Sequence, residues 1–195
     1  MALQVLVKAG SITNLSDARY CAGMGVEIIG FPVGKTNPLA LESTKIKEMT
    51  GWLSGIKVAL ELDKSGFDEN YTLELIETLH PDYLQIPIAL VENYKKIAEV
   101  PLLLVTDSTE LKSTNGEDIF LYEGNIIHNE KKLAAFCAEN NVILSGSQID
   151  TSSIKSILEE IKPFGLELKG GTEISPGLKS FDDLSEIFEL LEIGE

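Results

Sequence analysis

The chain has 195 residues, a formal net charge of −15, 44% hydrophobic residues and 24% charged residues. This length can bury a substantial core, and the composition is ordinary for a soluble globular protein. No apolar run approaches the roughly 20 residues that span a bilayer. The strong negative charge, with no run of Lys and Arg, argues against nucleic acid or an anionic membrane surface as a partner. No basic segment followed by an apolar stretch opens the sequence, so we expect no secretory signal and a cytoplasmic location.

Apolar, strand-like runs alternate with helix-like stretches along the whole chain. Such alternation is typical of successive βα units that build a parallel sheet. One helix is predicted after Asn14, a suitable capping residue, with Asp17 in its first turn. The segments after Ile86 and Thr106 predict helix only weakly, and the second reads as a loop with little helix. Strands are predicted at residues 3–8, 27–31, 56–62, 83–86, 102–106, 119–122, 142–144 and 166–169, and helices at 16–24, 67–79, 130–140, 152–161 and 181–191.

Eight βα units in this length leave about 24 residues for each unit, close to the lower size limit of a (β/α)8 barrel. No linker or low-complexity segment interrupts the pattern. We therefore predict an α/β protein with one TIM-barrel domain over residues 1–195, its eight strands parallel and the whole short for its class. The main rival is an open doubly wound sheet, which gives a similar sequence pattern.

The active site of a TIM barrel lies at the carboxyl ends of the strands, and this location sorts the candidate residues. His80 falls on an αβ loop at the opposite face, so a structural role is expected. His128 follows the sixth strand, where a lone histidine is more often an exposed loop residue. Cys21 and Cys137 lie in helix-like segments and are expected to be buried thiols. These residues form no credible metal-ligand cluster, and we expect neither a metal nor a cofactor.

Two glycine loops follow the last two predicted strands. Gly146 and Ser147 come after the seventh strand, and Gly170, Gly171 and Thr172 after the eighth. Glycine lets a backbone approach an anion closely, and amides at a helix start supply donors without added charge. Because both loops lie at the standard phosphate position of the barrel, they predict a phosphate-binding site.

Acidic residues mark several strand ends. Asp63, Asp107 and Glu123 are acid–base candidates, with surface solvation as the alternative for the first two. Glu167 lies inside the eighth strand and shares a strand face with Lys169, because side chains alternate along a strand. If that face is the barrel interior, these two are expected to pair. Lys169 otherwise adds positive charge at the phosphate loops.

Residues 7–20 read Val-Lys-Ala-Gly-Ser-Ile-Thr-Asn-Leu-Ser-Asp-Ala-Arg-Tyr, and residues 25–31 read Gly-Val-Glu-Ile-Ile-Gly-Phe. They resemble the opening of phosphoribosylanthranilate isomerases, in which Lys-Ile-Cys-Gly-Ile-Thr is followed by an acidic helix and by Gly-Ala-Asp-x-Ile-Gly-Phe. Residues 170–173 and 175–180 look like that family's Ser-Gly-Val-Glu and Pro-Gly-Val-Lys-Asp. The resemblance runs through the whole chain in order and is strongest over residues 5–31 and 142–181.

This resemblance implies a (β/α)8 barrel and an Amadori rearrangement in tryptophan biosynthesis, with a cysteine on strand one as base and an aspartate after strand six as acid. The sequence departs at both places. Gly10 stands where the cysteine belongs, and Ser11 beside it has no evident base. The family's long loop after strand six is missing, which leaves Glu123 as the candidate general acid. Lys35 stands on the loop that carries the family's arginine.

Three functions therefore remain open: a divergent isomerase using Glu123 with Ser11 or Asp107, an isomerase or lyase for another phosphosugar, and a non-catalytic phosphate-binding or regulatory barrel. Isomerase activity is expected to be weak or lost, with a modest gain on Gly10→Cys. The expected partner is a phosphorylated small molecule, and the chain a monomer or homodimer. Further ligand-contact candidates are Lys8, Lys35 and Glu167.

Overall fold

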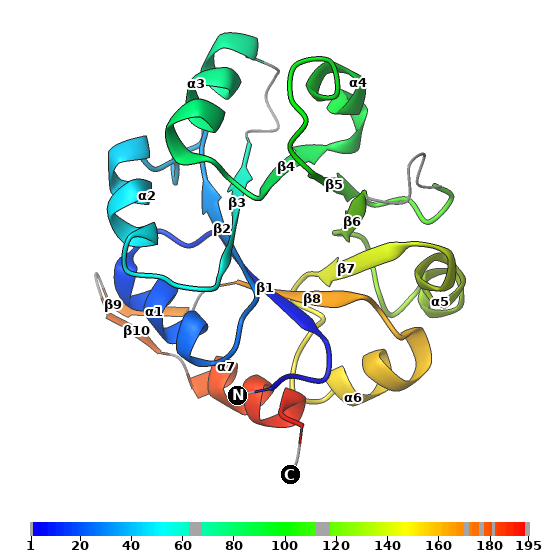
Figure 1. Ribbon diagram of the computed structural model, residues 1–195. Helices are drawn as coiled ribbons and strands as arrows, with labels where there is room; N and C mark the ends of the chain where they lie inside the picture. The colour runs from blue at the N-terminus through cyan, green and yellow to red at the C-terminus, as the bar shows by residue number, and fades with distance from the viewer. Residues whose placement is uncertain are drawn as a thin grey trace.

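The computed structural model describes residues 2–62, 68–111, 118–169, 172–175, 178–180 and 182–193. Eight parallel strands close into a barrel in sequence order, and β1 pairs with both β2 and β8 (Figure 1). This closure confirms the predicted TIM-barrel class and excludes the open doubly wound sheet. The strands are β1 (Leu6–Gly10), β2 (Ile28–Pro32), β3 (Lys57–Glu61), β4 (Tyr83–Pro87), β5 (Leu102–Thr106), β6 (Ile119–Tyr122), β7 (Asn141–Ser145) and β8 (Gly165–Lys169).

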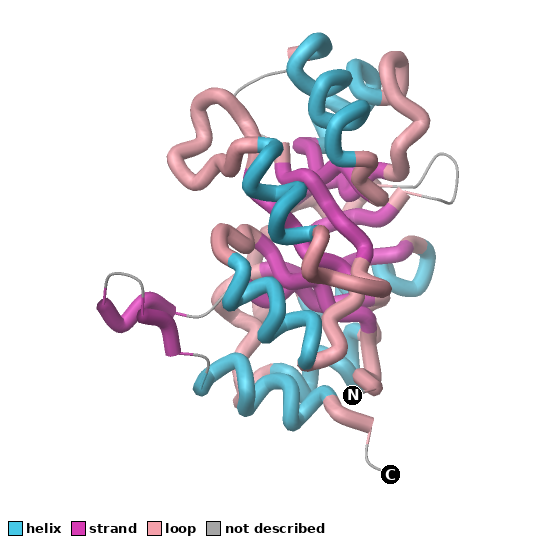
Figure 2. The backbone as a smooth tube through the Cα atoms, turned by 60° about the vertical axis from the view of Figure 1, so that its left-hand side comes forward, coloured by secondary structure: helices cyan, strands magenta, loops and turns pink. Residues whose placement is uncertain are grey.

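Helices surround this barrel on its outside (Figures 1 and 2). The weak helix prediction after β4 corresponds to short turns only, and the described residues between β5 and β6 (107–111 and 118) contain no helix. No helix in the described part of the chain is long and apolar enough to cross a membrane. The helices are α1 (Leu15–Gly23), α2 (Ser43–Thr50), α3 (Glu69–Leu79), the 3-10 turn η1 (Ile88–Leu90), α4 (Val91–Tyr94), α5 (Glu130–Glu139), α6 (Ile154–Ser156), the π turn η2 (Ile157–Ile161) and α7 (Asp182–Leu191).

Three elements, one helix and the two strands of a hairpin, were not predicted. Helix α2 was not predicted because only Ile46 and Met49 of its eight residues are buried. Two apolar positions are too few to show the hydrophobic periodicity of a helix. After β8, β9 (Thr172–Ser175) and β10 (Leu178–Ser180) pair as an antiparallel hairpin. Figure 2 shows this hairpin standing away from the barrel.

The first strand begins later than predicted because the N-terminal residues pair with the other end of the chain. Leu3 bridges Glu192, and the Gln4 N–H donates to the carbonyl of Leu191 at 2.9 Å. These contacts lie at the C-terminal end of α7, and β1 starts only at Leu6. The cap of α1 is as predicted: the Asn14 side chain accepts from the Asp17 N–H at 2.9 Å.

Side chains alternate along each strand between the helices and the barrel interior. Val7 and Ala9 of β1 belong to the large core under the helices, whereas Leu6 packs against a separate interior cluster. The same alternation directs Lys8 inward, because it is two residues after Leu6 on β1 and closer to the carboxyl end of the strand. Polar residues on the other strands share this inward phase above an apolar floor. That floor consists of Ile28, Ala59, Leu103, Ile119, Leu121 and Ile143.

Barrel closure predicts that substitution by alanine changes the stability of the fold very differently at two glycines. A Cβ at Gly165 would lie 2.9 Å from the backbone oxygen of Leu6 and 3.2 Å from Ile143 Cγ1, whereas one at Gly23 would meet nothing within 4 Å. Because Leu6 and Gly165 are paired across the β1–β8 seam, Gly165→Ala should destabilise the fold by roughly 1–3 kcal/mol. Gly23→Ala, at the end of α1, should be neutral or stabilising by up to about 1 kcal/mol. Urea unfolding of both variants measures this, and equal midpoints would contradict the described seam.

Candidate functional site

A fully buried ammonium lies inside the barrel, above the apolar floor. The Nζ of Lys8, from β1, is 2.6 Å from Glu61 Oε1 of β3 and 2.5 Å from Glu167 Oε1 of β8. Burial alone lowers the pKa of Lys8, but the charges of Glu167 and Glu61 outweigh it and raise the pKa above its ordinary value. Burial raises the pKa of Glu167, yet Lys8 and a hydrogen bond from Ser145 outweigh it and hold the pKa below its usual range. Two carboxylates around one ammonium leave this cluster with one negative charge.

Two serines complete the cluster. Ser145 Oγ, at the end of β7, donates to Glu167 Oε2. Both the N–H and the Oγ of Ser11 donate to Glu61 Oε2 at 3.1 Å. The sequence offered no base beside Ser11, so Glu61 corrects that expectation. Ser11 also has a φ of 55°, a left-handed conformation that is costly for a non-glycine residue and is found preferentially at functional sites.

Two glycines give the carboxylates their space. A Cβ at Gly10 would lie 2.5 Å from Glu167 Oε1, and one at Gly30 would overlap Glu61 Oε1. The Glu167 carboxylate therefore fills the space that a side chain at position 10 would need. The modest gain expected from Gly10→Cys is corrected accordingly, because the thiol cannot enter unless Glu167 moves away from Lys8.

Three further charged residues lie at the carboxyl ends of the strands, around the open end of the barrel, which we call the mouth. Glu123 is half-buried just beyond β6, and its N–H donates to the carbonyl of Thr106 at 2.9 Å. Asp107, just beyond β5, is exposed, as is Lys169 at the end of β8. Glu167 makes its ion pair with Lys8, and Lys169 contributes only a weaker, longer-range lowering of the Glu167 pKa.

The first glycine loop is open to an anion. Gly146 and Ser147 are exposed beyond β7, and Gly146 has a φ of 139°, which favours glycine. Nothing lies within 4 Å of a Cβ placed at Gly146. Gly170 and Gly171 of the second loop lie outside the described residues, and Thr172 begins β9. The phosphate site predicted from both loops stays a prediction.

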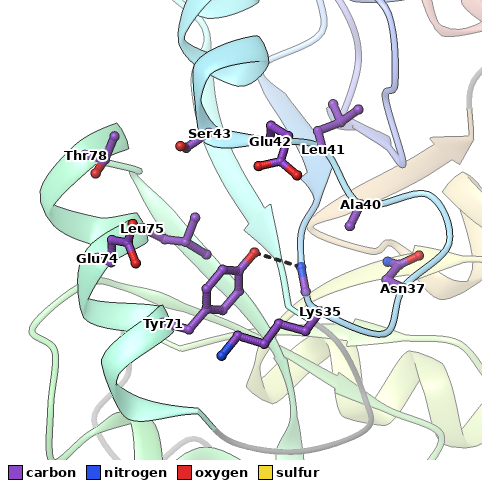
Figure 3. Close-up of a pocket in the computed structure, with 11 residues that line it drawn as sticks. Lys35, Asn37, Ala40, Leu41, Glu42, Ser43, Tyr71, Glu74, Leu75 and Thr78 are labelled. Atoms are coloured by element: carbon purple, nitrogen blue, oxygen red, sulfur yellow. Dashed lines mark hydrogen bonds between the residues drawn. The ribbon is translucent and has the colours of Figure 1, made fainter.

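Lys35 is engaged at a side pocket between the β2–α2 loop and α3 (Figure 3). Its Nζ lies 2.6 Å from Asp68 Oδ2 and 5.4 Å from the centre of the Tyr71 ring. The Tyr71 hydroxyl in turn accepts the Gly34 N–H at 3.2 Å. This pocket has a volume of about 360 Å³. Lys35 is thus already paired with a carboxylate, and its predicted role in ligand contact stays a prediction.

The remaining sequence candidates have structural roles. His128 is exposed and shares a 2.9 Å hydrogen bond with Asn125 Oδ1, and His80 ends α3 in a left-handed conformation. Cys21 and Cys137 are free thiols, the first buried and the second half-buried, where burial raises the pKa of Cys137 to about 12. In the part of the chain that the structure describes, no group of His, Cys, Asp and Glu could hold a metal ion.

The sequence reading missed Glu61 and Ser145 as site residues. The available signal was strand phase: Lys8, Glu61 and Glu167 each interrupt an apolar strand at an inward position. A buried charge must be paired, so three such positions in one barrel predict a cluster.

Comparison with known proteins agrees with this architecture. No family model matches the chain. An N-(5'-phosphoribosyl)anthranilate isomerase from Sulfurihydrogenibium sp. (strain YO3AOP1) is 24% identical over 206 residues, covering 96% of this chain and 99% of that protein. The protein of the same name from Aquifex aeolicus (strain VF5) is 28% identical over 207 residues, covering 95% and 97%.

Solved structures give the same match in three dimensions. The phosphoribosyl anthranilate isomerase of Thermus thermophilus superposes with a TM-score of 0.75 at 20% identity, over 95% of this chain and 97% of that one. Another isomerase, in complex with reduced 1-(o-carboxyphenylamino)-1-deoxyribulose 5-phosphate, superposes with a TM-score of 0.70 at 16% identity, over 95% and 97%. The sequence similarity to phosphoribosylanthranilate isomerases therefore runs through nearly the whole chain, and the solved isomerases share its barrel fold.

Proposed function

We propose that the chain is a phosphoribosylanthranilate isomerase-like barrel of the tryptophan-biosynthesis family that works in the cytoplasm and binds a phosphorylated, sugar-type ligand at the strand ends. We further propose that its isomerase activity is weak or lost. One observation carries the second proposal: the Glu167 carboxylate fills the space of a side chain at position 10.

The chemistry explains why this position matters. An Amadori rearrangement removes a proton from the sugar's C2 and delivers another to the ring oxygen, which requires a base and an acid on opposite sides of the substrate. Gly10 has no side chain to act as a base. Glu167 is a poor replacement, because its pKa lies below the ordinary range and its oxygens already accept from Lys8 and Ser145. Each acid–base group contributes about 10²–10⁴-fold to the rate, so a missing base alone makes turnover slow.

The phosphate end of the ligand has better support. The exposed residues Gly146 and Ser147 follow β7, and the exposed Lys169 ends the neighbouring strand β8. Backbone amides and one cation suit a phosphate even on a strongly acidic protein. A solved family structure holds a ligand with a 5-phosphate.

A second candidate function is an isomerase or lyase reaction on another phosphosugar. The contact between Ser11 and Glu61 favours it, because the Glu61 carboxylate is positioned to accept the hydroxyl proton of Ser11. Glu123 is the acid in this scheme. A phosphate-binding barrel without chemistry is the outcome if neither reaction is detected.

The first test is the fluorescence decay of freshly prepared phosphoribosylanthranilate. We expect wild-type turnover at least about 10²-fold below that of a family member with its cysteine base. Gly10→Cys alone should give no gain and a less stable protein, because the new thiol meets Glu167. Gly10→Cys combined with Glu167→Asp, which withdraws the carboxylate by one methylene, should gain activity, although the protein stays less stable than the wild type because the ion pair with Lys8 is weakened. Robust wild-type turnover would contradict the proposal, and turnover that survives Glu123→Gln would remove Glu123 as the acid.

The second test concerns the phosphate. Lys169→Met should weaken binding of inorganic phosphate by about tenfold, the loss expected for one charge-assisted hydrogen bond. Lys155→Met is the matched control, since Lys155 is 82% exposed on α6 and near Glu159. Titration calorimetry measures both variants. Equal affinities in the two variants would remove Lys169 from the site, and no phosphate binding to the wild type would contradict the proposed ligand.

A further inference from the structure

The side chain of Gln148 joins the two loops that follow β6 and β7. Its Oε1 accepts the N–H of Ile126 at 2.6 Å and the N–H of Ile127 at 3.4 Å. Both isoleucines follow Glu123 in the β6–α5 loop, whereas Gln148 follows residues 146–147 in the β7–α6 loop. One acceptor therefore connects the loop of the proposed phosphate site to the loop that carries the candidate acid.

The β6–α5 loop has little slack between its two anchors. At the first anchor, the Glu123 N–H donates to the carbonyl of Thr106 at 2.9 Å. Three residues later, Ile126 is buried and its N–H makes the bond just described. Gly124 between them lies close against Tyr122, because a Cβ there would be 2.4 Å from the tyrosine hydroxyl. A shift of the Ile126 amide therefore displaces the backbone that carries Glu123.

The β7–α6 loop is clamped at one end and permissive at the other. Ser153 Oγ donates to the carbonyl of Gln148 at 2.6 Å, and Asp150 Oδ1 accepts the Ser153 N–H at 2.9 Å. At the other end, Gly146 has a φ of 139°, and a Cβ there would meet nothing within 4 Å. Glycine loses more conformational freedom than any other residue when its backbone is fixed. An anion bound at this loop therefore restrains the backbone from which Gln148 reaches the other loop.

We propose that Gln148 is a positioning residue that couples phosphate binding at residues 146–147 to the order of the loop that carries Glu123. This inference rests on the proposed phosphate ligand. A ligand that orders one loop lowers the entropic cost of ordering a loop bonded to it, and this couples two sites without a large movement. A phosphorylated sugar is then favoured twice, at the phosphate itself and at the acid that its phosphate helps to hold in place.

Amide hydrogen exchange, followed by NMR with and without saturating inorganic phosphate, tests this coupling in the wild type. We expect phosphate to slow the exchange of the Ile126 N–H by at least about fivefold, the lower end of ordinary couplings between sites. The reference is the N–H of Leu39, which donates to Asn37 Oδ1 at 2.9 Å in the β2–α2 loop and should not change. Equal slowing of both amides would mean general stabilisation and would overturn the inference.

Variants then test the residue itself. Gln148→Met removes the acceptor at similar length, so the Ile126 N–H should exchange at least about fivefold faster in the free protein and no longer respond to phosphate. Gln148→Glu keeps acceptor oxygens and should retain the response at saturating phosphate. Asn129→Ala is the matched control, because Asn129 Nδ2 donates to the carbonyl of Asn125 at 2.8 Å within the same loop. This control should speed exchange in the free protein, but phosphate should still slow it.

Titration calorimetry separates failure of this inference from failure of the proposed function. Because coupling is reciprocal, Gln148→Met should bind inorganic phosphate about fivefold more weakly than the wild type. If the wild type binds phosphate without a change in Ile126 exchange, the inference is wrong and the phosphate ligand stands. If the wild type binds no phosphate, the proposed ligand fails and this inference fails with it.

The variant series has its own contradicting results. A phosphate response that survives in Gln148→Met would show that the coupling runs through other contacts. A response lost equally in Gln148→Glu and Gln148→Met would show that the acceptor is not the link. If thermal unfolding shows that Gln148→Met does not fold, Gln148→Asn takes its place with the same expected loss, because it withdraws the acceptor by one methylene.

Discussion

The ammonium of Lys8 is the constraint on which the upper half of the barrel depends. It has no exposed surface, and an isolated charge in such a place would cost several kcal/mol. Glu61 and Glu167 reach it from strands on either side of β1, and each is held in turn by a serine. Because the carboxylates must come this close, Gly10 and Gly30 have no room for a side chain.

This cluster also changes what the site can do. The resemblance to phosphoribosylanthranilate isomerases implies a cysteine base at position 10, but the space there is filled by the Glu167 carboxylate, which is paired with Lys8. The hydroxyls of Ser11 and Ser145 donate to the carboxylates of Glu61 and Glu167. The open glycine loop after β7 is outside this network. The proposed function separates ligand binding at this loop from isomerase chemistry at position 10.

Strand phase explains how much of this the sequence could predict. The strands and the barrel class were predictable because apolar runs recur at a regular spacing, and the Asn14 cap is a local pattern. Helix α2 was not, because only two of its residues are buried. The role of Glu61 was missed because its partners Lys8 and Ser11 are about 50 residues away, and only barrel closure brings β1 and β3 together with β8. Long-range pairing of this kind has no local signature.

Urea unfolding of a variant series at Lys8 tests the central claim most directly. The claim is that the Lys8 ammonium holds two buried carboxylates in place. Lys8→Met should lower the free energy of unfolding by about 3–5 kcal/mol, because both carboxylates lose their counter-charge. The triple variant Lys8→Met, Glu61→Leu and Glu167→Leu should recover most of that loss, because no buried charge remains. A Lys8→Met protein as stable as the wild type, or a triple variant no more stable than Lys8→Met, would contradict the account.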